Sequence, residues 1–172
     1  ESALDRQLLS FVKRIASAWA AMKARVSGHR GESFRPLEAS DRCISPSDFG
    51  FHNALMRASG EICFIDFEYA GWDDPAKMSC DFFAQPAVPV SLDHFDAFLR
   101  KSLSYSPNVE TLVERSRELL PVIQMEWCCI LLNEFLPDAA LRRQFANPIL
   151  EPERTRALQL EKAERSFSSI LG

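Results

Sequence analysis

Apolar residues recur three and four positions apart over most of this chain, and this spacing limits it to a fold built mainly from helices. The first such stretch runs from Leu4 to Val26, carries Arg and Lys on its other face, and ends at Ser27-Gly28. Pro121 is a candidate break in a later stretch, and Pro137 is expected to end that stretch. The later stretches with helical spacing are residues 75–83, 92–103, 109–136 and 153–170.

One short segment departs from the helical pattern. Residues 54–57 and 61–65 have the composition of two short strands, and Ala58-Ser59-Gly60 between them is typical of a tight turn. The polar residues from Ser27 to about Arg42 are typical of a loop. We therefore expect a mainly α fold with a small β-hairpin, formed as a single domain over residues 1–172.

The hairpin provides a geometric argument for a functional site. If its turn centres on Ser59, antiparallel pairing brings Asn53 level with Ile65 and Asp66. Asp48 precedes the hairpin in a loop that can curl over the same end. The oxygens of Asn53 and Asp66 suit Mg²⁺, and the separate carboxylate of Asp48 can orient or deprotonate a hydroxyl. A simpler interpretation is that Asp48 caps a turn and Asn53 begins a strand.

Four segments follow one another in a distinctive order and spacing. They are Asp48-Phe-Gly-Phe-His-Asn53, Phe64-Ile-Asp-Phe-Glu68, Ala70-Gly-Trp-Asp-Asp-Pro-Ala76 and Cys80-Asp-Phe82. Together they resemble the aminoglycoside phosphotransferase/choline kinase family. This resemblance implies the helical C-terminal lobe of a protein-kinase-like (α+β) fold. It also implies an enzyme that transfers the γ-phosphoryl group of ATP to a hydroxyl of a small molecule with the help of Mg²⁺.

The resemblance runs from about Ser45 to Phe83, with the catalytic and metal-binding loop and the hairpin at about residues 43–68, and it assigns roles to individual residues. Asp48 matches the catalytic base, and Asn53 and Asp66 match the magnesium ligands. Asp81 matches an aspartate that supports the catalytic loop. Asp74, in the Asp-Pro element, is expected to cap the helix that follows, and a simple helix cap is an equally good interpretation of Asp81.

Some features depart from the family pattern. The family usually has His two residues before the catalytic Asp, where this chain has Pro46, and the resemblance transfers no role to His52. His52 is either a substrate contact or a hydrogen-bonded loop histidine. Nothing before Asp48 matches the N-terminal lobe, which holds ATP with a β-sheet, a phosphate-covering loop and a Lys–Glu pair. We expect that lobe to lie elsewhere in the same protein, and this chain alone not to transfer phosphate efficiently.

Residues 125–135 give the few clues to the acceptor. Glu126 and Asn133 share a helical face and could present polar groups to a ligand, and Trp127 could stack on a sugar or cover an amine. Ordinary amphipathic packing accounts for the same pattern. Three acidic residues lie close to the site in the sequence and would favour a cationic acceptor: Glu68, Asp73 and Asp74. Their side chains could equally face solvent or the metal.

Two other functions fit the same residues. The chain could be a non-catalytic, kinase-like binding or regulatory domain, which Pro46 and the missing lobe motivate. Alternatively, Asp48 and Asp66 could act as an acid/base pair for hydrolysis that needs no nucleotide.

Composition narrows the partners and the compartment. The net charge of −4 gives no electrostatic reason to expect nucleic acid or an anionic membrane as a partner. No apolar run approaches the roughly 20 residues that cross a bilayer, and no signal-peptide pattern is present. The five cysteines lack metal-ligand spacing, so we expect reduced, mostly buried thiols in a cytoplasmic protein. A detached lobe would expose apolar surface, which is compatible with a dimer.

Overall fold

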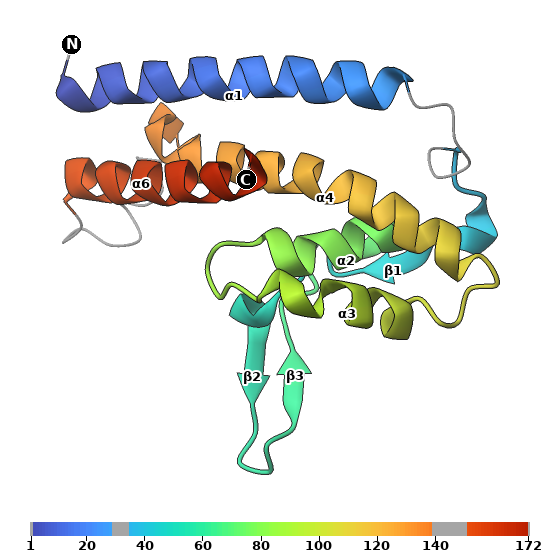
Figure 1. Ribbon diagram of the computed structural model, residues 1–172. Helices are drawn as coiled ribbons and strands as arrows, with labels where there is room; N and C mark the ends of the chain where they lie inside the picture. Colours follow the sequence, from blue (N-terminus) through green and yellow to red (C-terminus); the bar gives the residue numbers. More distant parts are fainter. Residues whose placement is uncertain (1, 29–34, 139–150, 172) are drawn as a thin grey trace. The chain divides into compact units, whose positions relative to one another are not determined.

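The computed structural model describes residues 2–28, 35–138 and 151–171, and within them the protein is mainly helical with two small antiparallel sheets (Figure 1). The α-helices are α1 (Ala3–Gly28), α2 (Pro75–Ala84), α3 (Phe95–Ser102), α4 (Val109–Leu131) and α6 (Pro152–Leu171). The strands are β1 (Cys43–Ser45), β2 (Ala54–Met56), β3 (Ile62–Phe64) and β4 (Gly71–Asp73). The expected class, mainly α with a small hairpin, is confirmed.

The predicted hairpin forms from β2 and β3. Ala54 pairs with Phe64 and Met56 with Ile62, and the Arg57 N–H donates to the Glu61 carbonyl at 2.8 Å. Gly60 closes the turn with φ at +85°, a left-handed conformation that glycine adopts without steric cost. The turn and the strand order therefore follow from the residues that predicted them.

A second sheet, between β1 and β4, was not predicted. Cys43 pairs with Asp73, and Ser45 pairs with Gly71. Each strand has three residues, too few to show the alternation that identifies a strand in a sequence. This pairing lies next to the hairpin in the chain and ties the segment before Asp48 to the segment after Asp66.

The helices agree with their predicted ranges, with one difference at Pro121. The range 92–103 begins as a 3₁₀ turn, η4 (Leu92–His94), which Ser91 caps by accepting from the Asp93 N–H at 3.3 Å. α4 continues through Pro121 without a break. A proline inside a helix removes one backbone hydrogen bond, and here residues buried on either side of it, Val113 and Ile123, pack the helix in place. The predicted end before Pro137 is confirmed, because the 3₁₀ turn η5 (Leu132–Phe135) ends there and Leu136 is extended.

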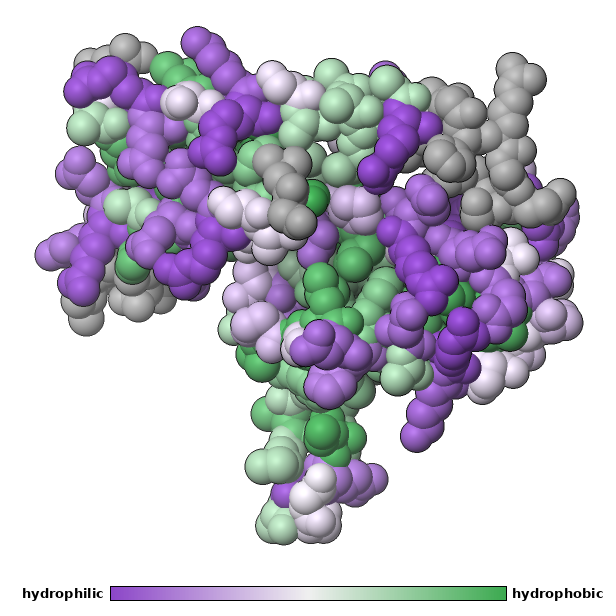
Figure 2. Space-filling view, in the orientation of Figure 1, coloured by the Kyte–Doolittle hydropathy of each residue, from purple (hydrophilic) through white to green (hydrophobic). Residues whose placement is uncertain are grey.

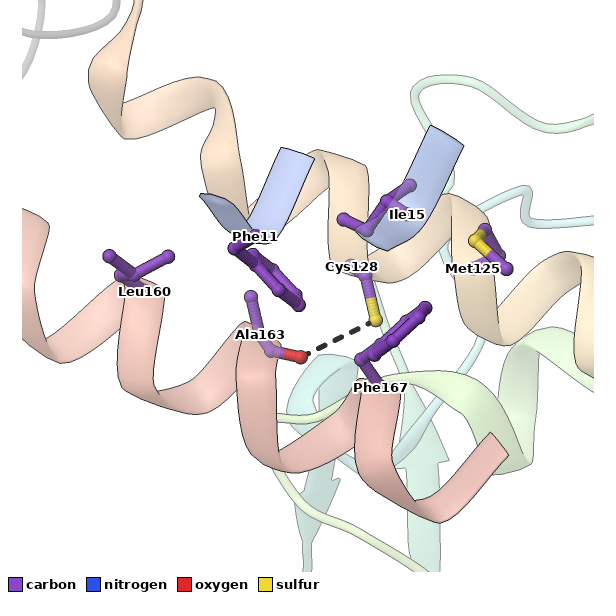
Figure 3. Close-up of a cluster of buried hydrophobic side chains, with 7 residues drawn as sticks. All are labelled: Phe11, Ile15, Met125, Cys128, Leu160, Ala163 and Phe167. Carbon is purple, nitrogen blue, oxygen red and sulfur yellow. Dashed lines mark hydrogen bonds between the residues drawn. The ribbon is translucent and has the colours of Figure 1, made fainter. Parts of the chain in front are cut away.

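The chain divides into two compact units. One consists of Glu1–Gly28 with Gln124–Gly172, and the other is His29–Ile123. In the first unit, α1, α6 and the C-terminal part of α4 bury an apolar cluster in which Phe11 meets Phe167 edge to face at 5.5 Å (Figure 3). The Cys128 thiol lies inside this cluster and donates to the Ala163 carbonyl at 3.6 Å. The remaining members are Ile15, Met125 and Leu160.

The second unit is built around a phenylalanine cluster. Its rings have centroids 4.9 to 6.5 Å apart and come from the loop before β2, from β3, from α2 and from α3. Phe82 is its centre, because it contacts five of the other six rings and is 5% exposed. The members of the phenylalanine cluster are Phe49, Phe51, Phe64, Phe82, Phe83, Phe95 and Phe98.

The hairpin exposes apolar side chains. Leu55, Met56 and Ile62 are 59%, 77% and 48% exposed, and Figure 2 shows hydrophobic surface on the hairpin that projects from this unit in Figure 1. Neighbouring exposed apolar side chains of this kind are typical of an interaction site.

All five cysteines are free thiols, as expected, but their burial differs from the prediction. Cys80 and Cys128 are fully buried, Cys43 and Cys63 are half-buried, and Cys129 is exposed. Cys129 follows a buried cysteine on a helix, so the helical turn directs it away from the core. In the parts of the chain that the structure describes, no helix combines the length and the apolar character that crossing a bilayer requires.

Candidate active site

The loop that leads to Asp48 is held by two serines. Ser45 is fully buried at the end of β1, and its hydroxyl accepts from the Ser47 N–H at 3.1 Å. The Ser47 hydroxyl donates to the Tyr69 carbonyl at 2.9 Å, and the backbone of Ser47 is left-handed, with φ at +69°. These hydrogen bonds fix the loop around Pro46, where the resembling family has a histidine. A left-handed non-glycine residue is costly and often lies close to a functional site.

The loop then closes on itself between Asp48 and Asn53. The Asn53 side-chain amide donates to the Asp48 carbonyl at 3.0 Å, and the Asn53 N–H donates to the Gly50 carbonyl at 3.1 Å. The side-chain N–H groups of Asn53 are thus turned toward the loop. Its Oδ1 is the atom left to act as an oxygen ligand.

Asn53 and Asp66 lie at the same end of the hairpin. The Ile65 N–H donates to the Asn53 carbonyl at 2.9 Å, one step beyond the last strand pair, Ala54 and Phe64. The prediction that antiparallel pairing brings Asn53 level with Ile65 is confirmed. Asp66 follows directly, is exposed, and has a left-handed backbone with φ at +64°. Aspartate tolerates this left-handed conformation better than most residues. The change in backbone conformation at Asp66 turns the chain away from the direction of β3.

The carboxylate of Asp48 has a partner that the sequence did not reveal. The Nε2 of His52 lies 2.8 Å from the Asp48 Oδ1, and the two side chains are 17% and 47% exposed, respectively. The two residues are four positions apart in a single turn of loop and 3₁₀ helix, η3 (Phe51–Asn53). The two interpretations of His52 from the sequence were a substrate contact and a hydrogen-bonded loop histidine, and the geometry agrees with the second.

A glycine makes room for this histidine. A Cβ atom at Gly50 would lie 2.7 Å from the His52 Nδ1 and 2.7 Å from the Gln85 Cγ. Gln85 is itself buried, and its Oε1 accepts from the Ala87 and Val88 N–H groups at 3.0 and 2.9 Å. The loop around Asp48 is therefore packed tightly on the end of α2.

The phenylalanine cluster anchors the same loop from its other side. Phe49 packs on Phe64 at 4.9 Å and Phe51 packs on Phe82 at 4.9 Å, so the two rings flanking Gly50 connect the loop to β3 and α2. Beside the cluster is an apolar hollow of about 440 Å³ that His94 and several phenylalanine rings line. It offers no acidic or strongly basic group for a metal or a phosphate, so the candidate site is the loop and not this hollow.

Asp74 and Asp81 both lie on or beside α2. The prediction that Asp74 caps the helix is confirmed, because its Oδ1 accepts from the Ala76 N–H at 2.9 Å. Its Oδ2 accepts from the Arg115 Nε at 2.7 Å. Asp81 is buried and pairs with the Lys77 Nζ at 2.7 Å. Its support of the catalytic loop stays a prediction.

These carboxylates make their surroundings electrostatically negative. Burial raises the pKa of the Cys43 thiol on β1, and the nearby Asp73 and Asp74 raise it further. Burial also raises the pKa of Cys80, helped by Asp81. Both thiols are thus kept protonated and are poor ligands and nucleophiles at neutral pH.

The donor set fits a hard cation with few protein ligands. Across residues 2–28, 35–138 and 151–171, no three or more His, Cys, Asp or Glu side chains gather into a metal-binding group. The predicted ligands are one carboxylate, on Asp66, and one amide oxygen, on Asn53. Mg²⁺ is commonly held by one or two protein oxygens, with water and substrate phosphates in its remaining positions, so the residues present are sufficient for it.

The predicted acceptor residues belong to the other unit. Glu126 lies on α4 and Asn133 on η5, and both are exposed, whereas Trp127 on α4 is half-buried. These exposures suit contact with a ligand or with water, and the role of the three residues stays a prediction. Compared with known proteins, the chain matches no protein-family model, no curated protein and no solved structure.

Proposed function

We propose that this chain is the C-terminal lobe of an ATP-dependent, cytoplasmic phosphotransferase with a protein-kinase-like fold, acting on a hydroxyl of a small molecule. The observation that carries the proposal is the hydrogen bond from the Ile65 N–H to the Asn53 carbonyl at 2.9 Å. Together with the Asn53 amide bond to Asp48, it supports the proposal, because it ties Asn53 both to Asp48 and to the residue directly before Asp66.

In this reaction Asp48 positions the acceptor hydroxyl and takes its proton. Its Oδ1 accepts from His52, so its Oδ2 is the oxygen that faces the acceptor. The acceptor oxygen forms a bond to the γ-phosphorus of ATP, and the bond between that phosphorus and the β–γ bridging oxygen breaks. The hydroxyl proton passes to Asp48, and ADP leaves with the bridging oxygen.

Asn53 and Asp66 would hold the metal at this site. A Mg²⁺ ion held there would supply positive charge to offset the negative charge that develops during transfer. The Asn53 side chain is held by its hydrogen bond to the Asp48 carbonyl, and its Oδ1 makes no part of that bond. The same hydrogen bond couples the position of the base to the position of the metal.

A nucleotide-binding N-terminal lobe of the same protein would complete the site. The exposed apolar side chains of the hairpin, Leu55, Met56 and Ile62, support this part of the proposal, because such side chains are usually covered in an assembled protein. A dimer through the same surface is a less direct way to cover them. Glu126, Trp127 and Asn133 belong to the other unit, and their role toward an acceptor stays a prediction from the sequence.

The test compares Asp48→Asn with the unchanged protein, nucleotide-binding lobe included. Radiolabelled ATP and Mg²⁺ are supplied with ethanolamine, glucosamine, glucose or glycerol as acceptor. We expect Asp48→Asn to lower kcat by about 10²- to 10⁴-fold while ATP binding is retained. Asp96→Asn is the matched control, because Asp96 is an exposed aspartate of α3 that pairs with Arg117.

Unchanged turnover in Asp48→Asn would remove Asp48 from the chemistry. ATP binding without transfer to any acceptor would favour the alternative, a kinase-like binding or regulatory domain. Turnover of a substrate without nucleotide would favour hydrolysis by Asp48 and Asp66 instead.

A further inference from the structure

His52 contacts the carboxylate that the proposed reaction uses, and the position of its ring is fixed from several directions. Its Nε2 lies 2.8 Å from the Asp48 Oδ1, and its ring is 17% exposed, much less than the carboxylate. It stands one residue before Asn53, whose side chain holds the Asp48 carbonyl at 3.0 Å. Both the carboxylate and the carbonyl of Asp48 are therefore held by neighbouring residues of one turn.

We infer that His52 is a positioning residue for Asp48, an inference that rests on the proposed phosphotransfer. The imidazole N–H donates to the Oδ1 and fixes the rotation of the carboxylate, which leaves the Oδ2 directed to the acceptor hydroxyl. A carboxylate that is 47% exposed and lacks such a partner would sample several rotamers, and a small misplacement of a reacting group can lower the rate by roughly 10²-fold.

The packing behind His52 supports a positioning role rather than a chance contact. Gly50 has no side chain, and a Cβ there would press on the His52 Nδ1 and the Gln85 Cγ, both at 2.7 Å. Gln85 cannot easily yield, since it is 1% exposed and its Oε1 accepts from two backbone N–H groups. The chain of contacts thus runs from α2 through Gln85 and Gly50 to His52, and ends at Asp48.

The geometry also specifies which nitrogen of His52 carries the proton. Because a carboxylate oxygen only accepts, the Nε2 facing Asp48 must be the protonated nitrogen. This requirement separates a hydrogen bond from mere proximity. It can be tested in the chain itself, without nucleotide or acceptor.

The first experiment is nitrogen NMR of the imidazole side chains in ¹⁵N-histidine-labelled chain at neutral pH. The chain has three histidines, and His52→Gln identifies the signals of His52. We expect a proton-bearing Nε2 whose chemical shift changes in Asp48→Ala and is largely preserved in Asp48→Asn, since asparagine retains an accepting oxygen. Gly50→Ala should change it as well, and Glu61→Gln, at the far end of the hairpin, should not. An unprotonated Nε2, or a shift that Asp48→Ala leaves unchanged, would overturn the inference whether or not the protein transfers phosphate.

The second experiment uses the phosphotransfer assay with whichever of the four acceptors turns over fastest. We expect His52→Leu to lower kcat about 10- to 100-fold, with the KM for ATP changed less than about threefold. His52→Gln, which offers an N–H at a similar reach, should recover at least half of this loss on a logarithmic scale. In the Asp48→Asn background His52→Leu should have no further effect, because the two residues act as a unit. Equal losses in His52→Leu and His52→Gln, or additive effects with Asp48→Asn, would contradict the positioning role.

Discussion

The unit formed by α1, α6 and the end of α4 buries one continuous apolar cluster, whereas the unit with the candidate site combines a cluster of phenylalanine rings with ion pairs and loop hydrogen bonds. In the helical unit, Phe11 and Phe167 meet in a core of aliphatic neighbours. In the site unit, the rings of Phe49 and Phe51 fasten a loop to α2, and the Asp74–Arg115 pair fastens α2 to α4.

This difference follows from what each unit has to do. Helices satisfy their own backbone hydrogen bonds, so the helical unit needs only an apolar face on each helix. A loop that presents Asp48 and Asn53 to solvent has to satisfy its backbone locally and needs individual contacts to stay in one conformation. The comparison predicts that single substitutions disturb the site unit in more specific ways than they disturb the helical unit.

The largest effects are expected from matched ring deletions in the two units. Phe82→Ala and Phe167→Ala each remove a buried ring, and each should lower the free energy of unfolding by about 3–5 kcal/mol. Phe82 contacts five other rings, so Phe82→Ala should raise hydrogen exchange at residues 48–53 and 62–64 and spare α1. Phe167→Ala should do the reverse. Equal exchange changes in both units for both variants would break the comparison.

A smaller effect is expected from the ion pair that joins α2 and α4. The Arg115 and Asp74 side chains are 16% and 14% exposed, so Arg115→Ala leaves a mostly buried carboxylate whose remaining partner is the N-terminus of α2, which it caps. We expect a loss of about 3 kcal/mol in the free energy of unfolding, at the lower end for buried pairs, measured by urea unfolding. Arg117→Ala is the control, since the Arg117–Asp96 pair is on the surface, and it should change little. Similar losses in the two variants would show that burial does not decide the contribution of these pairs.

The smallest effect is expected at alkaline pH, where one buried thiol in each unit should change the free energy of unfolding. Burial raises the pKa of Cys128 to about 12, and burial with the charge of Asp81 raises that of Cys80. Folding thus favours the protonated thiols, so their contribution is complete below the unfolded pKa of 9.0 and is lost as pH rises above it. The free energy of unfolding should fall by up to about 1.4 kcal/mol per pH unit for each thiol.

Denaturant unfolding between neutral pH and pH values above 9.0 measures this loss. Cys128→Ala and Cys80→Ala should each make the decline shallower, and Cys129→Ala, at an exposed position, should change it less. A decline that is the same in all three variants would show that other groups cause it.

The sequence predicted the helices and the hairpin because each carries a repeated or local signal. The spacing of Leu8, Ile15 and Met22 specifies the packed face of α1, and Ser59-Gly60 between two apolar runs specifies a turn. The pairing of β1 with β4 was not predicted, because a strand of three residues is too short to show the alternation of apolar and polar residues. The predicted break at Pro121 does not occur. The lost hydrogen bond at a proline is offset by tertiary packing of the helix, which cannot be read from the sequence.

The candidate site was predictable only in part for a similar reason. Counting outward from the hairpin turn places Asn53 opposite Ile65, so this pairing could be derived from the sequence. The contact between His52 and Asp48 depends on the torsions of one loop turn and on the space left by Gly50. A histidine followed by asparagine suggests nothing of this kind by itself. The roles assigned by the family resemblance to Asp48, Asn53 and Asp66 remain predictions until they are tested.

The most direct test of the central claim is metal binding by Asn53 and Asp66 in this chain. Mn²⁺ is added at millimolar concentration as a paramagnetic substitute for Mg²⁺, and backbone amide signals are followed by NMR, which detects weak binding. The account predicts selective broadening around Asp48, Asn53 and Asp66 that disappears in Asp66→Asn and persists in Glu61→Gln, a variant of the same hairpin at its opposite end. Broadening that spares these residues, or that Asp66→Asn leaves unchanged, would contradict it.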